Sequence, residues 1–208
     1  MTAHVTIQPK ILYFGTPVVL LSTENEDGTS NLAPMSSAWA LGQMVVLGLG
    51  VTGQTAHNLR ERPDMVINLP SPAQWTAVER LAPLTGRDPV PAHKRGFRYE
   101  PAKFEAAGLR PEPAELVRPQ RVAECPLQLE ARAARITPDL RGEFVIVEAD
   151  VLRVHADPAI VVPGTQHVDP TAWQPLIYNF RHYFGLGAQL GHSFRSDTPT
   201  AGRAAVVA

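Results

Sequence analysis

A short polar loop, Thr52-Gly53-Gln54-Thr55, separates an apolar segment from a segment with helical spacing. The first N–H groups of a helix lack partners inside the helix, and they carry the positive end of its dipole. The threonine hydroxyls and the Gln54 amide can donate further hydrogen bonds at the same point. The loop is therefore predicted to bind an anion such as a phosphate group, with an ordinary helix start as the alternative interpretation.

A second cluster of small and polar residues, Asn31-Leu32-Ala33-Pro34-Met35-Ser36-Ser37-Ala38-Trp39, precedes the same apolar segment. Its adjacent serines, Ser36 and Ser37, would let a flat ligand approach the backbone amides closely. The alternative is a surface loop with hydrated serines. Because the two loops bracket one buried strand, they form a single site if the fold brings them together.

The common catalytic motifs are missing from the sequence. It has no G-x-S-x-G elbow, no Walker loop and no H-E-x-x-H zinc motif. The segment Gly48-Leu49-Gly50-Val51-Thr52-Gly53 does match G-x-G-x-x-G, but its flanking strands are typical of hairpins and not of a βαβ unit. A dinucleotide-binding Rossmann site is therefore not expected.

The elements that must position these loops are mostly strands. The expected elements are strands over 12–23, 31–35, 45–50, 65–69, 121–135 and 143–155 and a helix over 55–62. Asp27-Gly28 indicates a hairpin turn, Thr55 is the expected N-cap of the helix, and Pro63 ends it. The last two strands are expected to pair as a long antiparallel hairpin. Without a βαβ rhythm, the sequence favours a mainly-β fold, an antiparallel barrel with appended helices.

Proline is unusually frequent, at 20 of 208 residues, about twice the ~5% average for globular chains. Half of the prolines fall between Pro70 and Pro126, which indicates a Pro-rich insertion at about 71–119. One helix is expected there, over 73–81, but no continuous core layer. Because strands of one barrel flank the insertion, residues 1–208 are predicted to form a single domain. The insertion is expected to lie across the barrel or to reach a partner subunit.

The overall charge excludes several classes of partner. Lys and Arg number 19 and Asp and Glu 20, so the formal net charge is −1 and no general field attracts nucleic acid or a membrane surface. The single cysteine, Cys125, cannot form an internal disulfide, and its spacing predicts a buried core thiol. No signal peptide or apolar run of ~18 residues is present, so a cytoplasmic protein is expected.

Five segments occur in a characteristic order and spacing, and together they cover most of residues 12–70 and 120–155. They are residues 31–39, Leu47-Gly48-Leu49, Thr52-Gly53-Gln54-Thr55-Ala56-His57-Asn58-Leu59, Val66-Ile67-Asn68-Leu69 and Ala123-Glu124-Cys125-Pro126-Leu127-Gln128-Leu129-Glu130. In these segments the chain resembles the flavin reductase-like family of FMN-binding split barrels. The resemblance implies a split, Greek-key, antiparallel β-barrel.

The resemblance also implies a homodimer with FMN held near the subunit interface. The FMN-binding residues it implies are Met35, Ser36, Ser37, Ala38, Thr52, Gly53, Gln54, Thr55 and Asn58. The first four would lie against the isoalloxazine ring, and the others would hold or lie near the phosphate. Many relatives carry a basic residue and then Asp where this chain has Gly53 and Gln54. His57, Arg60 or an arginine of the partner is expected to replace that cation.

A dense aromatic segment, residues 178–187, interleaves tyrosine and phenylalanine with Arg181 and His182. It would cover a flavin face or receive a nicotinamide, with His182 as the one catalytic candidate, or else it packs in the core. The remaining candidate histidines, His4, His93, His155, His167 and His192, are too scattered for a metal site. Glu124 and Glu130 are expected on a solvated or interface face.

The sequence therefore predicts an FMN-binding oxidoreductase that takes a hydride from NADH or NADPH. Flavin chemistry belongs to the cofactor, which agrees with the lack of an obvious acid–base pair. Reduced flavin would then diffuse to a monooxygenase partner or reduce a bound acceptor. The alternative is a non-catalytic split-barrel protein that uses FMN in a sensory or structural role.

Overall fold

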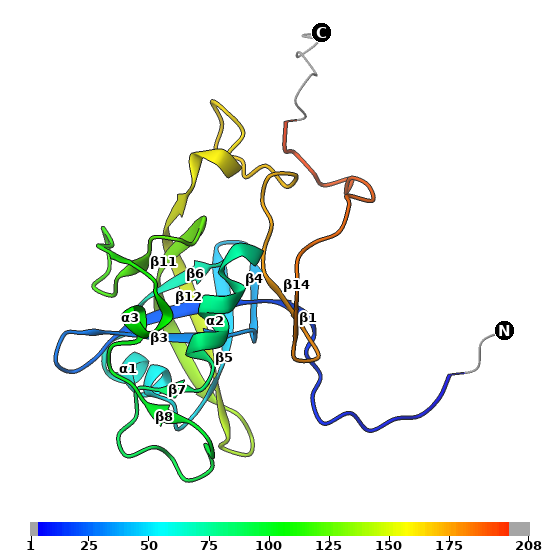
Figure 1. Ribbon diagram of the computed structural model, residues 1–208. Helices are drawn as coiled ribbons and strands as arrows, with labels where there is room; N and C mark the ends of the chain where they lie inside the picture. Colours follow the sequence, from blue (N-terminus) through cyan, green and yellow to red (C-terminus); the bar gives the residue numbers. More distant parts are fainter. Residues whose placement is uncertain (1–3, 200–208) are drawn as a thin grey trace, which may run out of the picture.

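The computed structural model describes residues 4–199, so residues 1–3 and 200–208 of the predicted domain lie outside the described residues. Its centre is a seven-stranded sheet in the order β3-β2-β6-β11-β12-β5-β4, with every neighbouring pair antiparallel (Figure 1). The strands are β2 (Val19–Glu24), β3 (Ser30–Met35), β4 (Ala38–Leu41), β5 (Met44–Gly50), β6 (Asp64–Leu69), β11 (Leu127–Pro138) and β12 (Phe144–Ala156). This confirms the mainly antiparallel prediction.

The two edge strands of this sheet, β3 and β4, are consecutive in the chain and are joined only by Ser36 and Ser37. The sheet therefore closes on itself through this connection, although β3 and β4 are not paired with each other. Near it the Gly48 N–H donates to the Ser37 carbonyl at 2.8 Å. The fold is a split β-barrel, and we call the Ser36-Ser37 connection its seam.

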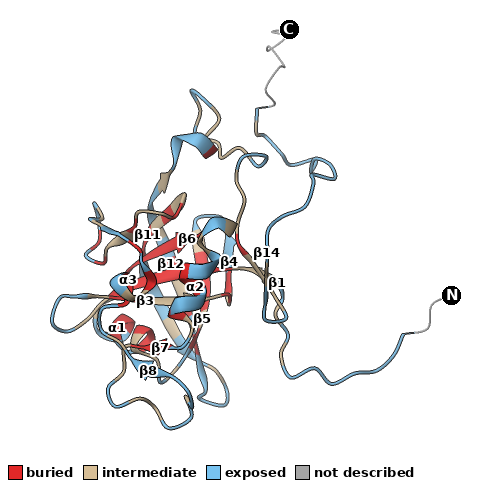
Figure 2. Ribbon diagram, in the orientation of Figure 1, coloured by how far each residue is buried: buried red, intermediate tan, exposed pale blue. Residues whose placement is uncertain are grey.

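The barrel is filled by alternate residues of its strands, as the period of two requires. On β12, Val145, Val147 and Ala149 are buried, whereas Phe144 and Ile146 are exposed on the outside. Figure 2 shows the buried residues concentrated in the barrel and under the adjoining helices. Strand β5 is buried on both faces along most of its length, which confirms the apolar reading of this segment.

The helix after β5 begins one residue earlier than the sequence predicts. Helix α1 spans Gln54–Glu61, and its N-cap is Gly53, which makes no side-chain capping hydrogen bond. Thr55 is therefore not the N-cap. Its hydroxyl instead accepts a hydrogen bond from Asn31 Nδ2 at 3.1 Å, because the loop turns the side chain towards the β2–β3 hairpin.

The Pro-rich segment packs on the barrel, one of the two arrangements expected, but it also contributes to a second apolar core, contrary to the expectation of no continuous core layer. Its elements, with the strand that follows it, are η1 (Pro72–Gln74), α2 (Trp75–Leu81), β7 (Leu84–Thr85), β8 (Arg98–Tyr99), α3 (Lys103–Ala107), β9 (Pro111–Glu112) and β10 (Arg121–Val122). Val78, Leu81 and Phe104 pack there with Leu20 and Leu32 of the barrel. Val78 and Leu81 show the helical period that predicted the helix, but Leu20, Leu32 and Phe104 lie too far from them in the sequence for any local period to predict that they pack together.

A separate three-stranded sheet joins the beginning and the end of the described chain. It pairs β1 (Phe14–Pro17) with β13 (Ile177–Asn179) and β14 (His182–Phe184), while the terminal segments run away from the barrel (Figure 1). A 3₁₀ turn, η2 (Pro158–Ile160), precedes it. The β13–β14 turn holds Phe180 and Arg181 at φ 44° and 69°, a conformation that costs non-glycine residues roughly 1–3 kcal/mol each. Within residues 4–199, no helix has the length and apolarity to cross a bilayer.

Glu130, which the sequence placed on a solvated or interface face, is fully buried. Its carboxylate accepts hydrogen bonds from the backbone N–H groups of Glu115, Leu116 and Val117 at 2.9, 2.6 and 3.2 Å. His155 Nε2 lies 2.6 Å from the same carboxylate. The alternation along β11 was predicted correctly, so Glu130 does point away from the barrel core. That outer face is not solvated, however, because the loop at 115–117 covers it. Cys125 is buried as predicted, and burial raises the pKa of its thiol.

Candidate functional site

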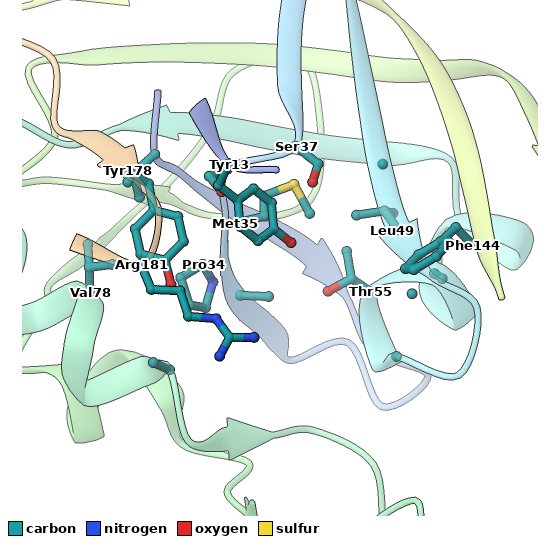
Figure 3. Close-up of a pocket in the computed structure, with 18 of the residues that line it drawn as sticks. Tyr13, Pro34, Met35, Ser37, Leu49, Thr55, Val78, Phe144, Tyr178 and Arg181 are labelled. Atoms are coloured by element: carbon teal, nitrogen blue, oxygen red, sulfur yellow. The ribbon is translucent and has the colours of Figure 1, made fainter. Parts of the chain in front are cut away.

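A cavity of about 730 Å³ lies between the seam, the β5–α1 loop and the β13–β14 hairpin (Figure 3). This volume falls within the ~300–1,000 Å³ range of small-molecule sites. Its described lining residues are Tyr13, Val18, Ala33, Pro34, Met35, Ser36, Ser37, Gly48, Leu49, Gly50, Gly53, Thr55, Ala56, Val78, Ala82, Lys94, Phe97, Phe144, Tyr178, Arg181 and Tyr183. Both loops that the sequence singled out therefore reach one cavity.

The seam forms one wall of the cavity. Met35, Ser36 and Ser37 line it, whereas Ala38 is not among the lining residues and packs in the barrel core. Gly48 favours the close approach of β5, since an added Cβ would lie 3.2 Å from Ser37 Cβ and would push it back by a few tenths of an ångström. The Gly48–Gly53 motif thus serves barrel closure at its first glycine, and its strand pairs antiparallel on both sides.

The β5–α1 loop forms a second wall, to which only part of the predicted set contributes. Gly53 and Thr55 line the cavity. Thr52 does not, and its hydroxyl lies 3.3 Å from His93 Nε2 in the Pro-rich segment. Gln54 and Asn58 are also absent from the lining, because both are engaged in a polar network behind the loop.

This network fixes the position of Thr55. Asn58 is fully buried and donates to Thr23 Oγ1 at 3.1 Å and to Asn25 Oδ1 at 2.9 Å. Asn31 Nδ2 donates to Thr23 Oγ1 and Thr55 Oγ1 at 3.3 and 3.1 Å. The amides therefore tie the helix start to the β2–β3 hairpin. They leave the Thr55 hydroxyl proton available to a ligand, since that oxygen accepts the Asn31 bond.

Two lysines of the Pro-rich segment supply positive charge at this end of the cavity. Lys103 is only 4% exposed, and its Nζ donates to Asn31 Oδ1 at 2.9 Å, one side chain behind Thr55. Burial, helped by the nearby charge of Lys94, lowers the pKa of Lys103 to about 8. Lys94 lines the cavity itself, and burial lowers its pKa too.

The cations that the described structure brings near this loop are these lysines, whereas the sequence offered His57, Arg60 or a partner's arginine. His57 and Arg60 are exposed on helix α1 and do not line the cavity. Sequence reasoning missed both lysines because they stand 42 and 51 positions after Thr52 in an irregular segment. The sequence did contain a signal that pointed to lysines, namely their rarity. The chain has 3 lysines against 16 arginines, and a lysine tolerates burial by shifting its pKa, whereas arginine stays charged.

The third wall is aromatic and comes from the joined chain ends. Tyr13, Tyr178 and Tyr183 line the cavity, with ring centroids 5.5 Å apart for Tyr13–Tyr178 and 5.3 Å for Tyr178–Tyr183. Arg181 also lines it, but His182, the predicted catalytic candidate, is exposed and does not. Alternation along β14 explains why Tyr183 lines the cavity and His182 does not, because neighbouring residues of a strand face opposite ways.

Fold and site together define a split-barrel protein with a cavity whose described lining includes Lys94, Arg181 and the tyrosines of the aromatic wall. The model of the family described as "Flavin reductase like domain" matches residues 11–187. The chain therefore belongs to the flavin reductase-like family, a family of flavin-related oxidoreductases.

Known relatives agree with this assignment. A Bacillus subtilis (strain 168) protein, "Uncharacterized protein YdfE", is 48% identical over 195 residues, which covers 92% of this chain and 94% of the relative. The flavoredoxin of Desulfovibrio vulgaris (Miyazaki F) superposes with a TM-score of 0.78 at 20% identity, covering 94% of this chain and all (100%) of that one. Nitrilotriacetate monooxygenase component B from Bacillus cereus gives 0.73 at 17% identity, covering 92% and 100%. At 20% and 17% identity, the two superposed structures show a shared fold alone.

Proposed function

We propose that the protein binds FMN in the cavity at the seam and transfers a hydride to it from NADH or NADPH. The observation that carries this proposal is the convergence of the seam and the β5–α1 loop on one cavity, with a buried lysine behind Thr55. Family membership supports a flavin ligand. In this proposal residues 1–208 act as one flavin-binding domain whose Pro-rich insertion supplies the cations.

The end of the cavity at α1 suits a phosphate group. Lys103 Nζ has one hydrogen-bond partner among the described residues, whereas an ammonium can donate three hydrogen bonds. A buried charge with unused donors is costly until an anion approaches it. Gly53 and the first amides of α1, the Thr55 hydroxyl and Lys94 would bind the phosphate, while Gln54 and Asn58 would hold this group in place.

The seam end suits a flat ring. Pro34, Met35 and Leu49 offer apolar contact there, and the backbone of Ser36 and Ser37 offers hydrogen bonds at the ring edge. When bound, FMN supplies the two-electron chemistry, and the chain binds it, orients it and excludes water.

A homodimer would complete this site. Trp39, Leu41, Phe144 and Ile146 are exposed apolar residues on β4 and β12, the two strands that flank β5, at 55, 68, 54 and 45% exposure. Contiguous apolar surface of this kind is typical of protein interfaces. Because Phe144 also lines the cavity, a second copy on this face would cover the ligand.

An anaerobic titration tests the function. Purified protein mixed with FMN is supplied with NADH or NADPH without oxygen, and the flavin absorbance is followed. The proposal expects bleaching with at least one nucleotide, faster than for free FMN. Binding of FMN without bleaching by either nucleotide would instead support the sensory or structural alternative, and no binding would refute both.

The phosphate end is tested by a pair of variants on one helix. Thr55→Ala removes a lining hydroxyl and should weaken FMN binding about tenfold, the value of one hydrogen bond to a charged group. His57→Ala, on the exposed side of α1, should leave it unchanged. Equal affinities of the two variants, measured by quenching of flavin fluorescence, would place the phosphate elsewhere.

The fate of the reduced flavin follows from whether it leaves the cavity. The superposed structures include one titled as a monooxygenase component, which supports a monooxygenase partner that receives reduced FMN. A cytoplasmic location agrees with such a partner and with the supply of NAD(P)H. The other outcome is that bound, reduced flavin reduces an acceptor inside the cavity. Such an acceptor would lie against the aromatic wall.

A further inference from the structure

The aromatic wall of the cavity contains a cation with no partner in the described structure. Arg181 lines the cavity from the β13–β14 turn, and it forms no ion pair or hydrogen bond with residues 4–199. The described lining contains no carboxylate at all. The nearest acidic group of this wall, Glu79, accepts the hydrogen bond of the Tyr183 hydroxyl at 3.0 Å. The guanidinium is therefore available to an anion that enters the cavity.

Arg181 lies apart from the phosphate end of the cavity. Figure 3 shows its side chain extending from the side of Tyr178 and Val78, with Thr55 and Phe144 across the cavity. Lys94 and Lys103 already provide the charge that the Thr55 end needs. A second cation at a distance from them would serve a second anionic group.

The backbone at this position argues against a purely structural role. A two-residue turn between paired strands with positive φ at both central residues is the type in which Asn-Gly is preferred. This turn carries Phe180 and Arg181 instead, with φ of 44° and 69°. The chain holds them there through the Phe180 N–H, which donates to the Tyr13 carbonyl at 2.6 Å. Strain of this kind concentrates at ligand-binding positions.

The neighbouring rings indicate the shape of the ligand. Tyr178 stands between Tyr13 and Tyr183 in tilted contact, which gives an aromatic surface beside the guanidinium. Planar rings stack on such surfaces, and an arginine fork binds carboxylate or phosphate through two parallel hydrogen bonds. Ring and anion would thus be recognised together.

We propose that Arg181 and the Tyr13–Tyr178–Tyr183 wall form a subsite for a second, planar ligand that carries an anionic group, next to the flavin. The proposal rests on the proposed function only in taking FMN as the first ligand. Two sources have this chemistry, an aromatic carboxylate that accepts electrons and a nicotinamide dinucleotide.

Benzoate and its neutral analogue benzamide test the subsite without turnover. Tryptophan emission reports binding with or without flavin, because Trp75 lies 6.3 Å from Tyr183, ring centre to ring centre. If the source is a carboxylate, wild type should bind benzoate about tenfold or more tightly than benzamide. If the source is the dinucleotide, the NADH KM should depend on Arg181. In Arg181→Gln the benzoate preference disappears if the source is a carboxylate. The NADH KM rises about tenfold if the source is the dinucleotide.

The matched control separates the guanidinium from the turn. Phe180→Gly relaxes the neighbouring positive φ and leaves Arg181 in place, so it should bind benzoate and NADH as wild type does. Arg181→Lys, which keeps the charge but not the fork, should lie between wild type and Arg181→Gln.

Three results would overturn the subsite. One is unchanged benzoate affinity and unchanged NADH KM in Arg181→Gln. The second is an equal loss in Phe180→Gly. The third is a loss confined to FMN affinity, since Arg181 would then belong to the flavin site. If the wild-type protein bound no FMN, the proposed function would fail while the benzoate titration of the flavin-free protein still decided the subsite.

Discussion

The most informative single residue is Lys103, a buried ammonium whose one hydrogen-bond acceptor among the described residues is a neutral amide oxygen. Desolvation penalises its charged form and brings its pKa to about 8. An anion bound nearby would restore the charged form and raise that pKa again. Ligand binding and protonation of this residue are therefore linked.

We expect FMN affinity to fall as the pH rises above about 8, because the free protein then loses the Lys103 proton that phosphate binding needs. Isothermal titration between pH 7 and pH 9.5 measures this, with proton uptake on binding at the upper end. Lys103→Met should bind FMN more weakly at pH 7 and lose this pH dependence. An identical pH profile in the variant would exclude Lys103 from the site.

The same pKa fixes the sign of a stability effect. The folded pKa lies below the ordinary lysine value of ~10.4, so burial of the charge is unfavourable below pH 8 and the penalty is relieved as the pH rises towards 10. Ligand-free wild type should thus gain free energy of unfolding relative to Lys103→Met across this range. Urea titrations of both proteins at each pH give the difference.

At the scale of elements, the β11–β12 hairpin supports the Pro-rich segment through Glu130. This carboxylate meets three backbone N–H groups and His155 in a site that water does not reach. The loop at 115–117 has no strand or helix of its own, and these bonds connect it to the barrel together with the ion pair between Glu115 and Arg153 of β12.

Glu130→Gln should lower the free energy of unfolding by about 1–3 kcal/mol. The amide that replaces the carboxylate keeps one acceptor oxygen, but its NH2 group would face the backbone N–H donors of the loop at 115–117. Glu124→Gln is the matched control, since Glu124 also accepts backbone and arginine N–H groups but is a quarter exposed on its side chain (25%), and it should cost well under half as much. Equal losses in urea unfolding would mean that burial is not what makes Glu130 important.

Elements were predictable wherever the apolar period was local. The β2–β3 hairpin follows from Asp27-Gly28, and the long β11–β12 hairpin follows from alternation on both strands. The second apolar core was not predictable, because Phe104 and Leu20 meet only after the chain has folded. Lys103 was not predictable for the same reason, since its partner Asn31 is 72 positions away in the sequence. The seam and the β5–α1 loop were predictable because each is one short, continuous segment. Pro126 also splits the predicted strand at 121–135 into β10 and β11.

At the scale of the molecule, the proposed homodimer rests on the exposed apolar residues of β4 and β12. Ile146→Glu places a charge in the centre of that apolar face and should convert a dimer into a monomer, as measured by light scattering during gel filtration. FMN affinity should fall with it, since the cavity at Phe144 would lose its cover. Leu140→Glu, at the fully exposed tip of the same hairpin, is the control and should change neither. A wild-type protein that is monomeric at all concentrations would contradict the dimer.

The pairing of β1 with β13 has a consequence for how the protein is made. Chains emerge from the ribosome N-terminus first, at about 5–20 residues per second. All seven barrel strands are complete by Ala156, so the barrel can close during synthesis. At that stage β1, next to Tyr13, has no strand to pair with, because the hairpin that carries Tyr178 and Arg181 has not yet been translated. The cavity is thus completed later than the barrel, because its aromatic wall needs the hairpin that is translated last.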